Sequence, residues 1–453
     1  MLFPTPTGMT ESAQIVGAVA VLMATWWISE ALPFAITALL PVILFPVFGV
    51  MEISQVTPAY ANHVIFLFFS GFIFALCLER WQLHKRIALH TINSFGFSYH
   101  KILLGFMVTT AFLSMWVSNT ATALMMIPIA VGVASQMESN EGGENQFSVS
   151  LLLGIAYAAS IGGVATLIGT PPNAILAGII EQQTGHSIGF FEWMTFAFPL
   201  ATIFLLIAWL YLKFLIKDKP GHSAGARDSL GRQLDQLPPL SREEKLVIGI
   251  FSSVCVLWVL RGLIDIELFK SIKDATIGLI GAVLLFIIPA SGGSQRLMDW
   301  KTAKKLPWDI LILFGGGFAL ASGFEQTELT QWLGLQFSFL QGVNVFLIIF
   351  VITVFVIFLT EITSNTATAS LLIPLMIALS LSLDMPPLLL ATAVAVATSY
   401  AFMLPVATPP NAIIFSTGRV PIQKMAKTGL LLNIMGSVLI TLFVTILAPW
   451  VLL

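Results

Sequence analysis

The chain has 453 residues, of which 57% are hydrophobic and only 10% are charged, with a formal net charge of -2. Soluble domains carry about 25% charged residues, so 21 basic and 23 acidic side chains are too few to cover soluble domains of this total length. The composition excludes a soluble enzyme, a nucleic-acid-binding protein and a disordered chain, and it predicts an all-α polytopic membrane protein.

Ten segments are long and apolar enough to cross a membrane, for which a helix needs about 20 apolar residues. In chain order they cover residues 12–29, 34–50, 63–78, 148–183, 190–216, 245–262, 274–290, 307–324, 385–415 and 428–452. Two further apolar stretches, 101–137 and 343–383, are about twice as long as one crossing requires. Each has a polar tripeptide at its middle, so each forms either two full crossings or one re-entrant hairpin.

Three polar segments separate these spans. Residues 79–100 and 325–342 mix polar and aromatic side chains, which is typical of helices in the membrane interface, although ordinary loops have a similar composition. Residues 217–244 contain many charges together with Pro220, Pro238 and Pro239. This third segment is predicted to be a cytoplasmic linker between two halves.

The distribution of Lys and Arg supports this order of spans. When the ten spans are threaded through a membrane, 18 of the 21 basic residues fall on one side, and only Arg261, Lys270 and Lys273 fall on the other. Because short cytoplasmic loops are enriched in Lys and Arg, the first side is predicted to be cytoplasmic. Both termini are then expected outside the cell.

The sequence contains an internal repeat. SNTATALMMIP begins at Ser118 and SNTATASLLIP begins at Ser364, with eight of eleven positions identical at an offset of 246 residues. TPPNAI follows in both halves, beginning at Thr170 and at Thr408. Each half contains five spans and one hairpin, and the odd number of spans inverts the second half relative to the first. Inverted repeats of this kind are typical of secondary transporters.

The SNT motifs are suited to bind an anion. Ser, Asn and Thr are favoured at helix N-termini, so a turn at Ser118-Asn119-Thr120 directs the positive end of the next helix into the protein. Ser364-Asn365-Thr366 is predicted to do the same from the opposite face. A single motif of this kind could be a packing feature, but its paired occurrence favours a binding site.

The TPPN motifs interrupt two spans. Proline breaks a helix interior but is accepted in the first turn, so Thr170-Pro171-Pro172-Asn173 predicts a helix that stops and restarts, with Thr170 as its cap. Thr408-Pro409-Pro410-Asn411 repeats the pattern. Four helix N-termini could therefore meet at one midplane site. No Lys or Arg lies near these motifs, so a bound anion would depend on helix ends, neutral donors and co-bound cations such as Na⁺.

Glu361 is a carboxylate inside an apolar segment, three residues before Ser364. Intramembrane carboxylates are candidates for function, and a coupling role or a structural hydrogen-bonded role are both open. The corresponding residue in the first half is Met115, so Glu361 is not part of a symmetric site.

The paired SNT motifs, each followed by a TPP-type break, resemble the divalent anion:sodium symporter family over nearly the whole chain. The resemblance implies a fold of the ion transporter superfamily with an elevator mechanism, a homodimer, and transport of dicarboxylates, tricarboxylates or sulfate, usually with Na⁺. It also implies a division into scaffold and transport parts. The scaffold would comprise residues 1–100 and 245–342, and the transport part residues 101–216 and 343–453, with hairpins at 101–137 and 343–383, broken helices at 148–183 and 385–415, and the linker at 217–244.

The resemblance also implies roles for individual residues. Substrate would bind at Ser118, Asn119, Thr120, Ser364, Asn365, Thr366, Thr408 and Pro409. A first Na⁺ would bind at Ser114, Ser118, Asn119 and the Gly169 carbonyl, and a second at Thr360, Thr363, Asn365 and the Ala407 carbonyl. Ser114 and Thr360 each precede their Asn by five residues, a symmetry that favours at least two Na⁺ sites and symport over exchange.

One feature departs from the family, whose members usually have eleven spans. This sequence opens MLFPTPTGMT and enters a repeat span at once, so the first family helix is expected to be either absent or cut off by the chosen start.

The sequence thus predicts a Na⁺-driven importer of C4-type dicarboxylates such as succinate, malate or fumarate. It would be a multi-pass homodimer of the cell inner (plasma) membrane, in contact with lipid and without a nucleic-acid partner. It is not expected to be an enzyme, because no catalytic cluster lies within the membrane spans. The alternatives are a dicarboxylate exchanger, a sulfate or tricarboxylate carrier of the same fold, or an anion channel.

Overall fold

The computed structural model describes residues 4–138, 146–216, 230–264, 272–291 and 295–452. Within these ranges the chain is built from helices, and the one β contact is an isolated bridge between Pro289 and Arg296, which confirms the predicted all-α fold. Lys270 and residues 217–229 of the predicted linker lie outside the described residues.

Helices occupy all ten predicted spans. They are α1 (Glu11–Ser29), α2 (Phe34–Thr37) with α3 (Leu40–Val47), α5 (His63–Arg80), α9 (Gln146–Val164) with α10 (Pro171–Thr184), α11 (Phe190–Leu215), α13 (Arg242–Leu263), α15 (Asp274–Ile287), α17 (Trp308–Gln326), α21 (Pro387–Ala397) with α22 (Pro409–Ser416), and α23 (Ile422–Ile446). Short helices α4 (Ile53–Val56), η1 (Thr57–Ala61), α16 (Trp300–Ala303) and α24 (Ala448–Val451) complete the connections.

The span predicted at 34–50 is helical but interrupted, because α2 and α3 are separate helices. Pro41 has no N–H to pair with the Thr37 carbonyl, so a regular helix cannot continue through this point. The Ala38 carbonyl instead accepts a hydrogen bond of 2.5 Å from the Tyr60 hydroxyl. A Cβ atom on Gly316 of α17 would lie 2.5 Å from the same carbonyl, so the break packs against a glycine.

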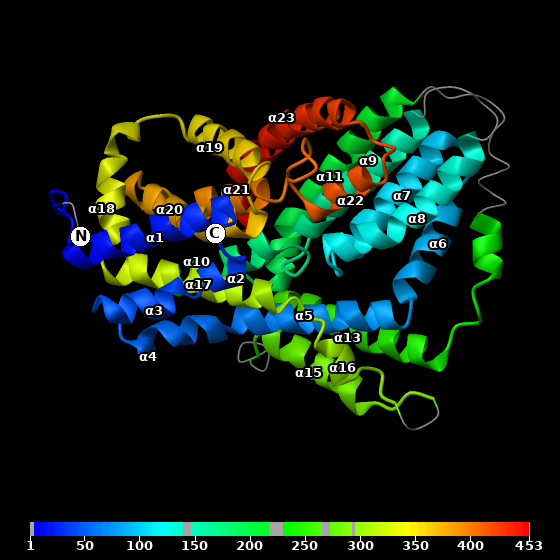
Figure 1. The fold of residues 1–453 in the computed structure, drawn as a ribbon, viewed down its shortest axis with the longest axis horizontal. Coiled ribbons are helices and arrows are strands. Elements are labelled where there is room, and N and C mark those ends of the chain that lie inside the picture. The colour runs from blue at the N-terminus through cyan, green and yellow to red at the C-terminus, as the bar shows by residue number, and fades with distance from the viewer. Residues whose placement is uncertain (1–3, 139–145, 217–229, 265–271, 292–294, 453) are drawn as a thin grey trace.

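The two long apolar stretches are helical hairpins. The first consists of α7 (Tyr99–Ser114) and α8 (Asn119–Glu138), and the second of α19 (Val345–Thr360) and α20 (Asn365–Ser382). The hairpins enter from opposite ends of the molecule (Figure 1). Since both tips line the same cavity as the two helix breaks, the hairpins end at the depth of the breaks, as re-entrant hairpins do.

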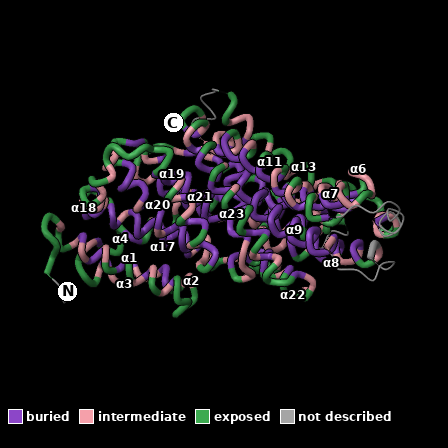
Figure 2. The backbone as a smooth tube through the Cα atoms, turned by 90° about the horizontal axis from the view of Figure 1, so that it is seen from above, coloured by how far each residue is buried: buried purple, intermediate pink, exposed green. Residues whose placement is uncertain are grey.

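The polar segments on either side of these hairpins are also helical. They contain α6 (Leu83–Phe95), α18 (Leu329–Gln336) and η2 (Ser338–Leu340). Figure 2 shows exposed and intermediate residues along α6 and α18, in contrast to the buried interior of the molecule. Both segments are therefore surface helices and not simple loops.

The core is formed by the first parts of the two broken helices. Residues 147–164 of α9 and 388–397 of α21 are buried throughout, and α9 packs against α7, α8, α11 and α22. A Cβ atom on Gly162 of α9 would lie 2.3 Å from the Ala111 carbonyl of α7, so α7 and α9 are in backbone contact there. Small residues allow such close approach between membrane helices.

A second apolar cluster joins α1 and α3 to α17 and α18, with Val16, Met23, Phe45 and Phe324 among its buried members. Large apolar side chains are exposed on the outer helices, for example Val256 on α13, Ile280 on α15 and Phe355 on α19. Exposed apolar surface of this extent marks a region that faces lipid or another protein.

Candidate functional site

One cavity of about 360 Å³ lies where the two hairpin tips and the two helix breaks meet. The first residues of α8, α10, α20 and α22 all line it, so four helix N-termini face one space, as the repeated motifs predict. Among the predicted site residues, those that line the cavity are Ser118, Asn119, Thr120, Gly169, Thr363, Ser364, Asn365, Thr366, Ala407, Thr408 and Pro409. The remaining two, Ser114 and Thr360, are fully buried next to it.

In the first half, oxygen atoms gather around Ser114. Its hydroxyl lies 2.5 Å from Asn119 Oδ1 and 2.8 Å from the Ala159 carbonyl oxygen of α9. A Cβ atom on Gly163 would lie 2.7 Å from Asn119 Oδ1, and one on Gly169 would lie 2.3 Å from the Gly163 carbonyl oxygen. Glycine at both positions therefore lets the backbone of the break approach the Asn119 side chain.

The second half repeats this arrangement. The Thr360 hydroxyl lies 2.6 Å from Asn365 Oδ1 and 3.1 Å from the Thr398 carbonyl oxygen at the end of α21. Thr363 differs, because its hydroxyl contacts the Leu359 carbonyl oxygen at 2.9 Å and the Thr368 hydroxyl at 2.8 Å. Two clusters of neutral oxygens therefore flank the cavity in related positions, one for each repeat.

Side chains cap three of the four helix N-termini. Ser118 Oγ accepts from the Ala121 N–H at 3.3 Å, Ser364 Oγ from the Ala367 N–H at 3.5 Å, and Thr408 Oγ1 from the Asn411 N–H at 3.3 Å. Thr170 stands at the N-cap position of α10, but its side chain makes no capping hydrogen bond. The prediction that the Thr170 side chain caps this helix is therefore wrong, although α10 begins where the motif predicts.

The asparagines of the TPPN motifs hold the two breaks together. Asn173 Nδ2 donates to the Thr166 carbonyl at 2.7 Å and to the Val164 carbonyl at 3.1 Å, and Asn411 Nδ2 donates to the Ala401 and Leu404 carbonyls at 3.1 Å each. These carbonyls have no partner within a helix, and buried backbone groups require one. This role of the two asparagines was not predicted, although their identical place in the repeated motif was a signal for it.

Glu361 holds the second break through its carboxylate. It accepts hydrogen bonds from the N–H groups of Phe402, Met403 and Leu404 at 2.7–2.9 Å, and from Asn433 Nδ2 of α23 at 2.7 Å. The structural hydrogen-bonded role is thus the one that the structure shows. Asn433 was not identified from the sequence, because only the tertiary fold brings α23 to this carboxylate.

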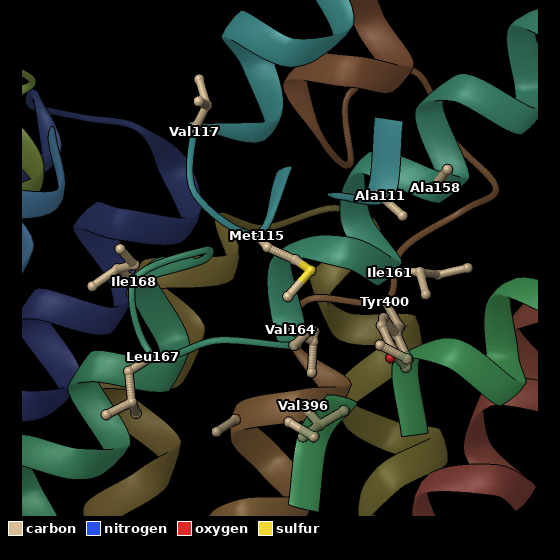
Figure 3. Packing of buried hydrophobic residues seen from close by; sticks show 14 of the residues in the cluster. Ala111, Met115, Val117, Ala158, Ile161, Val164, Leu167, Ile168, Val396 and Tyr400 are labelled. Atoms are coloured by element: carbon tan, nitrogen blue, oxygen red, sulfur yellow. The ribbon is translucent and has the colours of Figure 1, made fainter. Parts of the chain in front are cut away.

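The first break is shorter and uses no carboxylate. The Thr166 hydroxyl donates to the Met115 carbonyl at 2.6 Å, and the Trp193 indole N–H donates to the Val164 carbonyl at 2.9 Å. Met115, Val164, Leu167 and Ile168 belong to the buried apolar cluster around this break (Figure 3). The two halves therefore share their cavity-lining residues but differ in how the breaks are held behind them.

The charges at the cavity are acidic and lie at its rim. Glu30, which follows α1, and Asp309 of α17 are exposed and line the cavity, whereas no Lys or Arg side chain is among its lining residues. Neither acid was predicted as a site residue, since neither lies in a repeated motif. Each helix N-terminus contributes the equivalent of roughly half a positive charge, so the positive potential of the site comes from the backbone.

The described residues contain no group of three or more His, Cys, Asp or Glu side chains that could hold a metal ion. A transition-metal centre is therefore not built from these side chains. Hydroxyl, amide and carbonyl oxygens are instead ligands for hard cations, and these are what the two clusters around Ser114 and Thr360 supply.

Inverted repeats with hairpins and broken helices around a central cavity define a secondary transporter. A family model described as the sodium:sulfate symporter transmembrane region matches residues 1–453. The chain belongs to this family, the divalent anion:sodium symporter family that the motifs resemble. It is a multi-pass protein of the cell inner (plasma) membrane and a transporter, not an enzyme.

Known relatives agree with this assignment. The sodium-dependent dicarboxylate transporter SdcS of Staphylococcus saprophyticus is 44% identical over 458 residues, which is 99% of this chain and 88% of the relative. The protein of the same name from Staphylococcus aureus (strain MRSA252) is 45% identical over 463 residues, or 100% of this chain and 89% of the relative.

A solved structure shares the fold. The crystal structure of the Alcanivorax borkumensis YdaH transporter, reported to have an unusual topology, matches 98% of this chain and 100% of its own with a TM-score of 0.64. At 15% sequence identity, this likeness concerns the fold alone.

Proposed function

We propose that the protein imports C4-type dicarboxylates such as succinate, malate or fumarate, driven by Na⁺. The observation that carries this proposal is the cavity in which two symmetric SNT tips face each other, each with an oxygen cluster behind it. The names of the SdcS relatives, which describe sodium-dependent dicarboxylate transporters, support the same substrate and ion.

The proposed substrate site has one half for each carboxylate group. Asn119 and Thr120 would bind one carboxylate and Asn365 and Thr366 the other, with Ser118 and Ser364 as helix caps and Thr408 and Pro409 along the wall. Helix N-termini stabilise anions through free N–H groups and the helix dipole. Two such ends on opposite sides favour a substrate with a charge at each end.

The proposed Na⁺ sites lie behind the SNT tips. The first would use Ser114, Ser118, Asn119 and the Gly169 carbonyl, and the second Thr360, Thr363, Asn365 and the Ala407 carbonyl. Asn119 and Asn365 would then contact both a cation and a carboxylate. Since no basic side chain lines the cavity, bound Na⁺ would offset the charge of the dianion. This requirement would couple transport of the dianion to transport of Na⁺.

We infer an elevator movement, in which residues 101–216 and 343–453 carry the site past a scaffold of residues 1–100 and 245–342. The rim residues Glu30 and Asp309 lie at helix ends that the Lys and Arg distribution assigns to the cytoplasm. The cavity of this structure would therefore be open inward, and the movement would expose it outward. The scaffold would also form the contact between two copies of the chain in a homodimer.

Uptake of labelled succinate into liposomes containing the purified protein tests this function. An inward Na⁺ gradient is expected to accelerate uptake, and unlabelled succinate is expected to compete more strongly than citrate, 2-oxoglutarate or sulfate. Uptake that ignores Na⁺ but requires internal dicarboxylate would establish an exchanger. A current proportional to the gradient, without Na⁺ flux, would establish a channel, and stronger competition by sulfate or citrate would change the substrate class.

A further inference from the structure

An ion-pair cluster joins α10 to two helices of the proposed scaffold. Glu181, near the end of α10, lies 2.6 Å from Lys273 Nζ and 2.9 Å from His63 Nε2. Lys273 precedes α15 and His63 begins α5. The cluster does not line the central cavity. By the predicted topology it lies on the extracellular side, opposite the open rim of that cavity.

The internal repeat relates this cluster to a second pair of charges. The offset of 246 residues that aligns the SNT motifs places His63 onto Asp309, and the offset of 238 that aligns the TPPN motifs places Glu181 onto Arg419. His63 and Asp309 each lie in the first turn of a scaffold helix, and Glu181 and Arg419 each follow a helix break. Asp309 and Arg419 are opposite in charge, and in the first half the acid is Glu181, with the imidazole of His63 and the ammonium group of Lys273 as its partners.

The second pair is arranged differently from the first in this structure. Asp309 is exposed at the rim of the central cavity. The Arg419 guanidinium donates to the Ser135 hydroxyl at 3.0 Å and to the Ser148 hydroxyl at 3.4 Å. Ser135 and Ser148 lie on α8 and α9, which belong to the same proposed transport part as Arg419. Arg419 is thus bound within that part, whereas Glu181 is bound across to the scaffold.

We propose that these pairs are alternating latches of the transport cycle. This inference rests on the elevator movement of the proposed function. In the inward-open state, Glu181 binds His63 and Lys273 and closes the outer side. When the transport part moves outward, these contacts break, and Arg419 leaves the two serines to bind Asp309 and close the inner side. Because the repeats are inverted, one pair forms as the other separates.

The test measures which side of the membrane reaches the cavity. Val406 lines the cavity and is exposed, so Val406→Cys, in a chain whose two cysteines are replaced by alanine, is labelled with a membrane-impermeant maleimide from either side of oriented vesicles. Glu181→Gln is expected to increase labelling from outside relative to inside. Asp309→Asn is expected to change this ratio in the opposite direction. In the double variant, Glu181→Gln with Asp309→Asn, the ratio is expected to return toward that of the parent protein. Each change should be about two- to fivefold, the factor given by loss of one surface ion pair.

Glu192→Gln is the matched control. Glu192 lies 3.3 Å from the His186 imidazole on the same predicted side, but both residues belong to the transport part, so the ratio should not change. A double charge reversal, Asp309→Arg with Arg419→Asp, is expected to restore the ratio that either single reversal changes. This rescue would not occur if the two residues had separate structural roles.

Two results would overturn the latches: equal ratios in Glu181→Gln and Asp309→Asn, or shifts of the same sign. Succinate uptake by the same vesicles separates these results from the proposed function, because uptake can persist when the latches are absent. Labelling from one side only in every variant would instead contradict the elevator movement itself.

Discussion

Asn119 and Asn365 each connect two parts of the site. Each begins a helix whose N-terminus faces the cavity, and each places its Oδ1 atom 2.5–2.6 Å from the hydroxyl five residues earlier. The side chain therefore connects the cavity to the buried oxygen cluster behind it. A residue in this position can couple a cation to an anion, because both would contact the same amide.

Replacing either asparagine by alanine is expected to abolish uptake while leaving the fold intact. The substitution removes an amide shared by the cation and the carboxylate, and the helix still begins at the preceding serine. Succinate uptake by the purified Asn119→Ala or Asn365→Ala variant in liposomes measures the effect, with thermal unfolding as the control for folding. Robust uptake by either variant would contradict the site assignment.

Glu361 is a buried acceptor for three N–H groups and one amide. In Glu361→Gln, an amide NH₂ replaces one carboxylate oxygen and cannot accept the hydrogen bonds made to that oxygen, and the remaining oxygen carries no charge. Hydrogen bonds to charged groups contribute about 1.5–3 kcal/mol each, so a loss of roughly 3 kcal/mol in unfolding free energy is expected, together with reduced uptake. Thermal unfolding in detergent checks this, with the exposed Glu328→Gln as the matched control. Unchanged stability would show that the break is held without the carboxylate.

At the scale of elements, the contact between α7 and α9 depends on the absence of a side chain at Gly162. A methyl group there would lie 2.3 Å from the Ala111 carbonyl oxygen. Backbone atoms cannot turn aside as a flexible side chain can, so the two helices would have to separate. Ser114 at the end of α7 and the break after α9 form one side of the site, and their separation would disturb it.

Gly162→Ala is expected to destabilise the protein by about 1–3 kcal/mol, the usual cost of overpacking a core. Gly132→Ala on α8 is the matched control, because no atom lies within 4 Å of its added methyl group, and alanine favours a helix over glycine. Melting temperatures of the two variants in detergent test this difference. Equal melting temperatures would indicate that α7 and α9 have room to separate.

For the whole molecule, the proposed homodimer requires an exposed apolar face that contacts a second chain and not lipid. α13 is the most exposed of the long apolar helices within the described residues. Purified protein in detergent is expected to have the protein mass of two chains by light scattering after size exclusion. Replacing Val256 and Leu257, both exposed on α13, by tryptophan is expected to shift the mass toward one chain. A single-chain mass for the parent protein would contradict the homodimer.

Much of this fold can be predicted from the sequence, since membrane spans depend on local hydropathy and the repeat is visible as sequence identity. The SNT and TPPN motifs place the hairpin tips and helix breaks correctly, because proline and helix-capping residues act within one turn of the chain. The break between α2 and α3, the partners of Glu361 and the lack of a cap at Thr170 were not predicted. The partners of Glu361 lie 41–72 residues away in the sequence, whereas the break between α2 and α3 follows from the local effect of Pro41.

The sequence by itself determined the membrane location, the inverted repeat and the residues at the helix ends, because these follow from composition and from local backbone chemistry. Only the tertiary structure decided that four helix ends share one cavity, that its charges are acidic and at the rim, and that Glu181 binds across to the scaffold helices. These features depend on distances between segments up to some 380 residues apart, such as Glu30 and Pro410 at the same cavity. Such distances are set by packing between helices, which hydropathy and local propensity do not encode.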